Sequence, residues 1–348
     1  MGSKRKRQAQ DVLPTTPPSK KHQKATKSRE SDAPVLAPTS RPFADEPKGA
    51  ELKREVEFYE RLGSQDASER LQAADAVVSG LIGGEGVSEA VLQRHLERRL
   101  FRGLASGRKA ARLGFSVVLA EILAQLFGPK QLSSNKYKAL TFDKVLDILK
   151  AKTKPEGDLS GQEERDHALG LLFGLQCFVH AKILSEDSED RWEKIFESVL
   201  QLAKKKPWIR EECGWVIIEA LEHISQSQAE KMVEMIHGAG LAASPEGVGI
   251  WLTARRRFPG MKFPSKPWGD KGNPLHHLQA LAKALKESSN PISNGKEEEV
   301  RQKGSWNPQL HFVWDIVMSE YIKLMKVNID GSLVQFEHFW KITVDGKY

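Results

Sequence analysis

The chain has 348 residues and a mass of 39.0 kDa, which corresponds to two or three average domains or to one elongated repeat array. Apolar residues make up 39% and charged residues 28% of it, so the chain can bury a sizeable core and wholesale disorder is excluded. Two cysteines exclude a disulfide scaffold and a cysteine-based zinc site. No apolar run approaches about 20 residues and the N-terminus lacks a signal-peptide core, so we expect an intracellular protein without a membrane segment.

Positive charge is concentrated at the N-terminus. The net charge is +7, and residues 1–30 contain nine basic and two acidic groups, so the rest of the chain is neutral. The excess of basic residues therefore belongs to the N-terminus and does not by itself indicate that the rest of the chain binds DNA. Residues 1–50 are polar and rich in proline, and we predict that they form a disordered basic tail.

Two clusters of cations in this tail are typical of a nuclear import signal. They are Lys4, Arg5, Lys6 and Arg7, followed by Lys20 and Lys21. Acidic pockets of import receptors bind such clusters, and phosphates attract them equally well. A basic tail that is merely solvated is the alternative. The tail thus predicts an import receptor as a partner and a nuclear location.

From residue 51 onward, apolar residues recur with the spacing of amphipathic helices. Helices are predicted at 51–62, 67–82, 88–104, 105–127, 141–151, 162–184, 191–205, 207–223, 226–237, 245–254, 274–287, 308–326 and 333–342. Thr141 and Ser244 are predicted N-caps, and Pro207 suits the first position of a helix. No convincing strand is found, although 333–336 and 342–344 come near one.

Consecutive long helices with short connections predict an all-α body over 51–348. Helix pairs such as 191–205 with 207–223 favour a HEAT- or armadillo-like α-solenoid. Clean internal repeats are not visible, and a compact helical bundle is the alternative. Three stretches interrupt the helices: a polar linker at 152–161, an irregular surface loop at 255–274 and a polar insert at 287–305.

No catalytic motif is found in the sequence. It contains no phosphate-binding loop, no dinucleotide-binding glycine pattern and no metalloprotease or hydrolase motif. Asp143 and Asp147 lie one helical turn apart, but a solvated helix face explains them better than a metal site. Cys177 and Cys213 fall on apolar helices and behave as small hydrophobic residues. We therefore expect a protein that is not an enzyme and that needs neither a metal nor a cofactor.

Two groups of cations are candidates for contact with nucleic acid. The first consists of Arg102, Arg108, Lys109 and Arg112, preceded by Arg98 and Arg99. Arg108 and Arg112 are four residues apart and would share a helix face. Ion pairing with acids of neighbouring repeats, Glu97 and Glu121 included, is the favoured alternative. The second group is Arg255, Arg256 and Arg257 on the predicted loop, where solvated charge is the alternative.

Six segments of the body together resemble the DNA polymerase phi family, also called DNA polymerase V, which includes the Myb-binding nucleolar protein group. They are FYERLGSQDASERLQAA (58–74), RGLASGRKAARLGFSVVLAEIL (102–123), EERDHALGLLFGLQCFV (163–179), KKPWIREECGWVIIEAL (205–221), WNPQLHFVWDIV (306–317) and FWKITVD (339–345). The resemblance covers about residues 51–345.

The resemblance implies a helical-repeat protein of the nucleolus that regulates ribosomal RNA gene transcription and ribosome biogenesis. Members of the family associate with ribosomal DNA, transcription regulators and pre-ribosomal proteins. The family name suggests a DNA-directed DNA polymerase, but no polymerase motif is present, and a solenoid transport or assembly adaptor is a further alternative. Because members continue beyond the segment at 339–345, the resemblance also implies that this chain corresponds to their N-terminal part.

Overall fold

The computed structural model describes residues 43–157, 160–185, 190–289 and 310–344, which lie in one compact unit, Thr39–Tyr348. Every regular element in these ranges is helical, so the predicted all-α class is confirmed. The basic tail before residue 43 and most of the predicted polar insert lie outside the described ranges.

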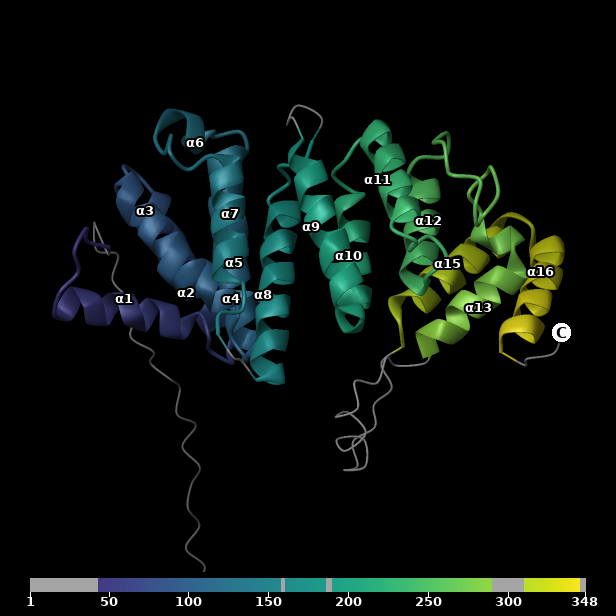
Figure 1. The fold of residues 1–348 in the computed structure, drawn as a ribbon, viewed down its shortest axis with the longest axis horizontal. Coiled ribbons are helices and arrows are strands. Elements are labelled where there is room, and N and C mark those ends of the chain that lie inside the picture. The colour runs from purple at the N-terminus through teal and green to yellow at the C-terminus, as the bar shows by residue number, and fades with distance from the viewer. Residues whose placement is uncertain (1–42, 158–159, 186–189, 290–309, 345–348) are drawn as a thin grey trace, which may run out of the picture. The chain divides into compact units, whose positions relative to one another are not determined.

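Most of the helices follow one another with short connections, and a longer loop at 258–273 separates α12 from η3 (Figure 1). They are α1 (Ala50–Arg61), α2 (Ala67–Ile82), α3 (Glu89–His95), the π-helical turn η1 (Leu96–Leu100), α4 (Phe101–Leu104), α5 (Lys109–Phe127), α6 (Leu132–Asn135), α7 (Phe142–Lys152), α8 (Gly161–His180), α9 (Arg191–Lys205), the 3₁₀ turn η2 (Pro207–Ile209), α10 (Arg210–Ala220), α11 (Gln226–Gly238), α12 (Pro245–Arg257), the 3₁₀ turn η3 (Pro274–His276), α13 (Leu278–Ser289), α15 (Phe312–Val327) and α16 (Ile329–Thr343).

The central helices pack against helices that lie two or three elements away along the chain. Helix α5 packs between α2 and α8, α10 packs between α8 and α12, and α12 packs against α15. A second row places α4 against α7 and α9 against α11, and an ion pair of 2.6 Å between Asp143 and Lys194 joins α7 to α9. This nearest-neighbour packing is what an α-solenoid requires.

Helix α5 supplies the densest part of the core. The side chains of Val118, Leu119, Ile122 and Leu123 are fully buried, and each contributes roughly 1.5–3 kcal/mol by leaving water. In the described part of the chain, α5 alone has the length and mean hydropathy of a membrane-spanning helix, with 56% of that window buried inside the fold. From the sequence we expected no apolar run of this length, and α5 departs from that expectation. In the fold, α5 is a core helix between α2 and α8.

The predicted helix signals are found where the sequence placed them. The Thr141 hydroxyl accepts a hydrogen bond from the Lys144 N–H at 3.3 Å, and Ser244 caps α12 through the Gly247 N–H at 3.1 Å. Pro207 opens the 3₁₀ turn that leads into α10. The strand-like stretch at 333–336 lies inside α16, which packs against α13 and α15. Leu333 and Val334 are exposed there, and Phe336 contacts the Tyr321 ring of α15 at 5.4 Å.

Two predicted boundaries are wrong. Helix α12 runs to Arg257, and the loop that follows is anchored in the core by Trp268, which is 1% exposed and donates its indole N–H to the Ala242 carbonyl at 2.8 Å. The predicted tail is also too long, because Phe43 is buried with its ring 5.9 Å from that of Phe58. In each case one aromatic side chain, Trp268 or Phe43, anchors a stretch that its polar neighbours made look like a surface segment.

Candidate nucleic-acid interface

The predicted helix 88–104 is three elements, and the π-helical turn η1 lies in its middle. The N–H of Phe101 bonds to the carbonyl of Leu96, five residues earlier. Such a turn inserts an extra residue and changes which side chains point inward, and it is often found at functional sites. Here it separates Arg99, which turns towards α1, from Arg98, which is exposed.

Arg94 and Arg99 both pair with Glu55 of α1. This carboxylate is 1% exposed, with Oε2 at 3.3 Å from Arg94 Nη2 and Oε1 at 3.3 Å from Arg99 Nε. A buried carboxylate is tolerated only when its charge is compensated, and two partly exposed guanidinium groups provide that compensation. Arg99 also lies over the Tyr59 ring at 5.8 Å. Arg94 therefore holds α1 against α3, and Arg99 holds it against η1.

His95 completes this buried cluster as a neutral imidazole. Burial, together with the charges of Arg94 and Arg99, lowers the pKa of His95 from 6.5 to about 3. Its Nε2 lies 3.0 Å from Arg94 Nη2, which has only hydrogens to donate, so Nε2 accepts. The ring then carries its proton on Nδ1 and donates to the Tyr59 hydroxyl at 2.7 Å.

Arg112 is also occupied by the fold. Its Nη1 donates to the Ser106 carbonyl and lies 3.5 Å from the Asp166 carboxylate of α8, and its guanidinium lies 5.9 Å from the centre of the Phe173 ring. Its partner is thus an acid of α8, and it is neither Glu97 nor Glu121. Those two glutamates accept instead from Gln93 at 2.6 Å and Gln125 at 2.7 Å on their own helices.

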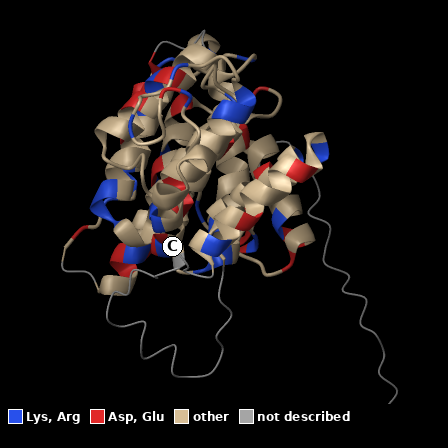
Figure 2. Cartoon of the chain, turned by 90° about the vertical axis from the view of Figure 1, so that its right-hand side faces the viewer, with Lys and Arg blue, Asp and Glu red and all other residues tan. Residues whose placement is uncertain are grey.

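Four other cations of this segment are exposed. Arg98, Arg102, Arg108 and Lys109 make no ion pair within the described ranges. We call these four the basic patch. Arg108 does not share a helix face with Arg112, because it precedes α5 with an extended backbone (φ −94°, ψ 119°). On the side of the body seen in Figure 2, acids and bases are interspersed, so any preference for anions depends on such local groups.

The N-terminus of α5 adds to the positive potential of the basic patch. No side chain caps this end, and its first turn contains Lys109 but no acid. A cation is disfavoured at the positive end of the helix dipole, whereas an anion is favoured there. The side chain of Arg108 extends from the same point towards Gly63. Phosphate oxygens are the ligands that such an arrangement attracts most strongly.

The second predicted group lies at the end of α12 and not on a loop. Arg257 donates to the carbonyls of Leu221 at 3.1 Å and Glu222 at 3.0 Å, which follow the last turn of α10. Arg256 lies 3.5 Å from Glu320 of α15. These two side chains thus join α12 to its neighbours on both sides, and Arg255 alone makes no ion pair in the described part of the chain.

No cluster of three His, Cys, Asp or Glu side chains among the residues that the structure describes has the spacing of a metal site. Asp143 is paired with Lys194. Cys177 and Cys213 are buried, and burial raises the pKa of the Cys177 thiol to about 12, so it is not ionised at neutral pH.

The predicted import signal, Lys4 to Arg7 with Lys20 and Lys21, lies outside the described residues. The cluster around Glu55 was not predicted. A signal for it was present, because Glu55 occupies the same helix stripe as the buried residues Phe58, Tyr59 and Leu62. A carboxylate on an apolar stripe indicates a buried partner, but its identity requires the tertiary fold.

Comparison with known proteins places the chain in a family. The model of the DNA polymerase phi family matches residues 95–348, which include η1 and the basic patch. The chain belongs to the DNA polymerase phi family. The family resemblance drawn from the six sequence segments is thereby confirmed, and no solved structure is significantly similar to the chain.

Two curated relatives in the family are named as regulators of ribosomal DNA transcription. The rDNA transcriptional regulator pol5 of Schizosaccharomyces pombe is 29% identical over 304 residues, covering 84% of this chain and 29% of the relative. The rDNA transcriptional regulator POL5 of Saccharomyces cerevisiae is 28% identical over 334 residues, covering 84% of this chain and 33% of the relative. The chain thus spans about a third or less of these relatives.

Proposed function

We propose that this chain acts in the nucleus and nucleolus as a non-enzymatic helical scaffold that regulates ribosomal RNA gene transcription and ribosome biogenesis. Its membership of the DNA polymerase phi family and the names of both relatives support this function. Its partners are ribosomal DNA, transcription regulators and pre-ribosomal proteins, and the basic tail binds an import receptor. The neighbour-to-neighbour helical packing supports a scaffold, because stacked helices present extended surfaces to partners.

The basic patch makes the contact with nucleic acid. The observation that carries this assignment is that Arg102, Arg108 and Lys109 are exposed without an ion-pair partner within the described ranges, and that Arg108 and Lys109 lie at the uncapped end of α5. Arg112, which the sequence also suggested, is excluded from the contact because Asp166 and Ser106 occupy its guanidinium. The contact is to phosphates and is therefore expected to be independent of base sequence.

Fluorescence anisotropy with a labelled DNA duplex tests this contact. The full chain is compared with the triple variant Arg102→Gln, Arg108→Gln, Lys109→Gln over a series of salt concentrations. Each lost phosphate contact lowers the slope of log affinity against log salt by about 0.9, so the triple variant is expected to lose up to about 3 from that slope. Its affinity at low salt should fall in parallel.

A matched control removes the same charge elsewhere. Lys204, Lys205 and Lys231 are exposed and make no ion pair within the described residues, so their triple change to Gln should leave the slope within about 1 of the wild type. Equal affinity and slope for the two triple variants would contradict the assignment. Incorporation of nucleotides by the purified full chain with primer, template and Mg²⁺ would contradict the non-enzymatic part of the proposal.

A further inference from the structure

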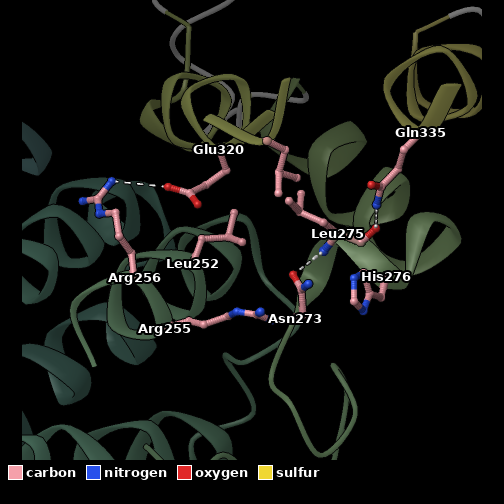
Figure 3. A pocket seen from close by; sticks show the side chains of 9 residues that line it. Leu252, Arg255, Arg256, Asn273, Leu275, His276, Glu320 and Gln335 are labelled. Carbon is pink, nitrogen blue, oxygen red and sulfur yellow. Dashed lines mark hydrogen bonds and ion pairs between the residues drawn. The ribbon is translucent and has the colours of Figure 1, made fainter. Parts of the chain in front are cut away.

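A pocket of about 220 Å³ lies where the last turn of α12 meets η3, α15 and α16 (Figure 3). Its apolar wall is formed by Leu252, Leu275 and Leu324. Its polar wall is formed by Arg255, Asn273 and His276, which come from α12, the following loop and η3, and Figure 3 shows Arg255 extended towards Asn273. This volume is several times the roughly 30 Å³ of one water molecule, so the pocket accommodates a small ligand.

The carboxylate that lines the pocket is already neutralised. Glu320 lies 3.5 Å from Arg256 and 2.9 Å from Lys323, so its charge is compensated on the α15 side. Arg255 has no such partner in the described part of the chain. It makes a 3.5 Å hydrogen bond to the Lys271 carbonyl, which is long, so most of its N–H donors remain available.

Two neutral donors complete the polar wall. The Asn273 side-chain oxygen accepts from the Leu275 N–H at 3.2 Å, which fixes the amide and leaves its Nδ2 hydrogens without an acceptor among the described residues. Asn273 is 8% exposed, so its orientation is held by the fold. The imidazole of His276 makes no hydrogen bond within the same ranges. Three donor groups from three segments thus face one cavity.

The electrostatic environment of His276 is positive. Partial burial lowers its pKa, and the charges of Arg255, His277 and Lys271 lower it further. The carboxylate of Glu320 on the opposite wall is paired with Arg256 and Lys323, and Gln335 of α16 is neutral. A bound anion would reverse this effect and favour the protonated imidazole.

We propose that this pocket binds a phosphate monoester, with its dianionic head on Arg255, Asn273 and His276 and its carbon-bearing part against the leucines. A guanidinium can bind two phosphate oxygens at once, which leaves the third terminal oxygen for the two other donors. The apolar wall distinguishes an ester from inorganic phosphate, because free phosphate would leave the leucines uncovered. The site is separate from the basic patch and does not rest on the proposed function.

Isothermal titration of the full chain with phenyl phosphate at low ionic strength tests the site. We expect binding that is at least tenfold weaker for Arg255→Gln and unchanged for Lys326→Gln, which removes an exposed charge on α15 outside the pocket. Arg255→Lys keeps the charge and loses the planar fork, so it should also bind more weakly, and it serves if Arg255→Gln does not fold. Thermal unfolding of each variant reports whether the fold is kept.

The pH dependence provides a second readout. As the pH is lowered from 8 to 6, the affinity of the wild type for phenyl phosphate should rise more steeply than the affinity of His276→Gln. Protonation of the ligand affects both proteins equally and therefore cancels when the two are compared. Inorganic phosphate should bind more weakly than phenyl phosphate, and so should a dinucleotide that has only a phosphodiester.

Three results would overturn the proposal: no binding of phenyl phosphate up to about 10 mM, equal affinity of Arg255→Gln and Lys326→Gln, or binding of the phosphodiester as tight as that of the monoester.

Discussion

The Glu55 carboxylate lies 3.3 Å from the Arg99 guanidinium, and this contact ties α1 to the π-helical turn η1. Glu55 is almost fully buried, whereas the Arg99 side chain is 36% exposed, so the pair neutralises a charge that the core could not otherwise hold. The same turn leaves Arg98 exposed. Two adjacent arginines thus differ in role, since Arg99 neutralises a buried carboxylate and Arg98 lies at the surface.

The first prediction concerns that carboxylate. Glu55→Gln should lower the free energy of unfolding by about 3 kcal/mol, because Arg94 and Arg99 lose their counter-charge beside a buried site. Urea unfolding followed by circular dichroism measures the change. Glu57→Gln on the same helix is the control, since its exposed pair with Arg61 contributes only about 0.3–0.5 kcal/mol. Equal losses for the two variants would show that Glu55 is not electrostatically compensated as described.

The second prediction concerns His95 and acid. Because its pKa is lowered to about 3 in the folded state and is near 6.5 when unfolded, protonation favours the unfolded chain as the pH falls below about 6.5. The contribution to stability is fully present at neutral pH and is lost progressively between pH 6.5 and pH 3. Wild-type stability should therefore fall more steeply than that of His95→Gln, by up to about 1.4 kcal/mol per pH unit. Parallel pH profiles of the two proteins would refute this.

The third prediction concerns the approach of α5 to the turn after α1. A Cβ at Gly114 would lie 2.0 Å from the Leu62 carbonyl oxygen, so Gly114→Ala forces the backbones apart. We expect a loss of about 3 kcal/mol or more in the free energy of unfolding. Gly161→Ala at the start of α8 has nothing within 4 Å of the added atom and should be neutral or slightly stabilising. Similar denaturant midpoints for both variants would contradict the close contact.

The fourth prediction concerns delivery to the nucleus. Replacing Lys4, Arg5, Lys6 and Arg7 with Ala should reduce nuclear accumulation of a fluorescently tagged full chain at least several-fold, because the import receptor recognises clustered cations. Lys24→Ala with Lys27→Ala removes isolated charges of the same tail and serves as the control. Unchanged nuclear accumulation after loss of the first cluster would leave the tail without an import role.

Most helices were predictable because their patterns are local. The stripe from Phe115 to Leu123 and the caps at Thr141 and Ser244 depend on residues a few positions apart, and helical periodicity and capping act over that range. The end of α12 was misplaced because three arginines look like a surface loop in sequence. In the fold, Arg256 and Arg257 find partners on α15 and beyond the end of α10, and these contacts hold the helix to Arg257.

The candidate sites were only partly predictable. The sequence indicated the cations at 102–112 but not which of them remain free, since that depends on Asp166, which lies 54 positions after Arg112. The pocket at Arg255 was not predicted at all, because its walls come from α12, η3, α15 and α16, segments more than 80 residues apart at the extremes.

By itself, the sequence determined the all-helical class, the neutral body and the basic tail, since charge and periodicity are properties of neighbouring residues. Only the tertiary structure decided that Arg99 and Arg112 serve the fold while Arg102 and Arg108 face solvent. The reason is physical. The charged group of an arginine or lysine is the same at every position in a sequence, so the sequence alone does not reveal its role. That role depends on whether packing brings a carboxylate within about 4 Å of it.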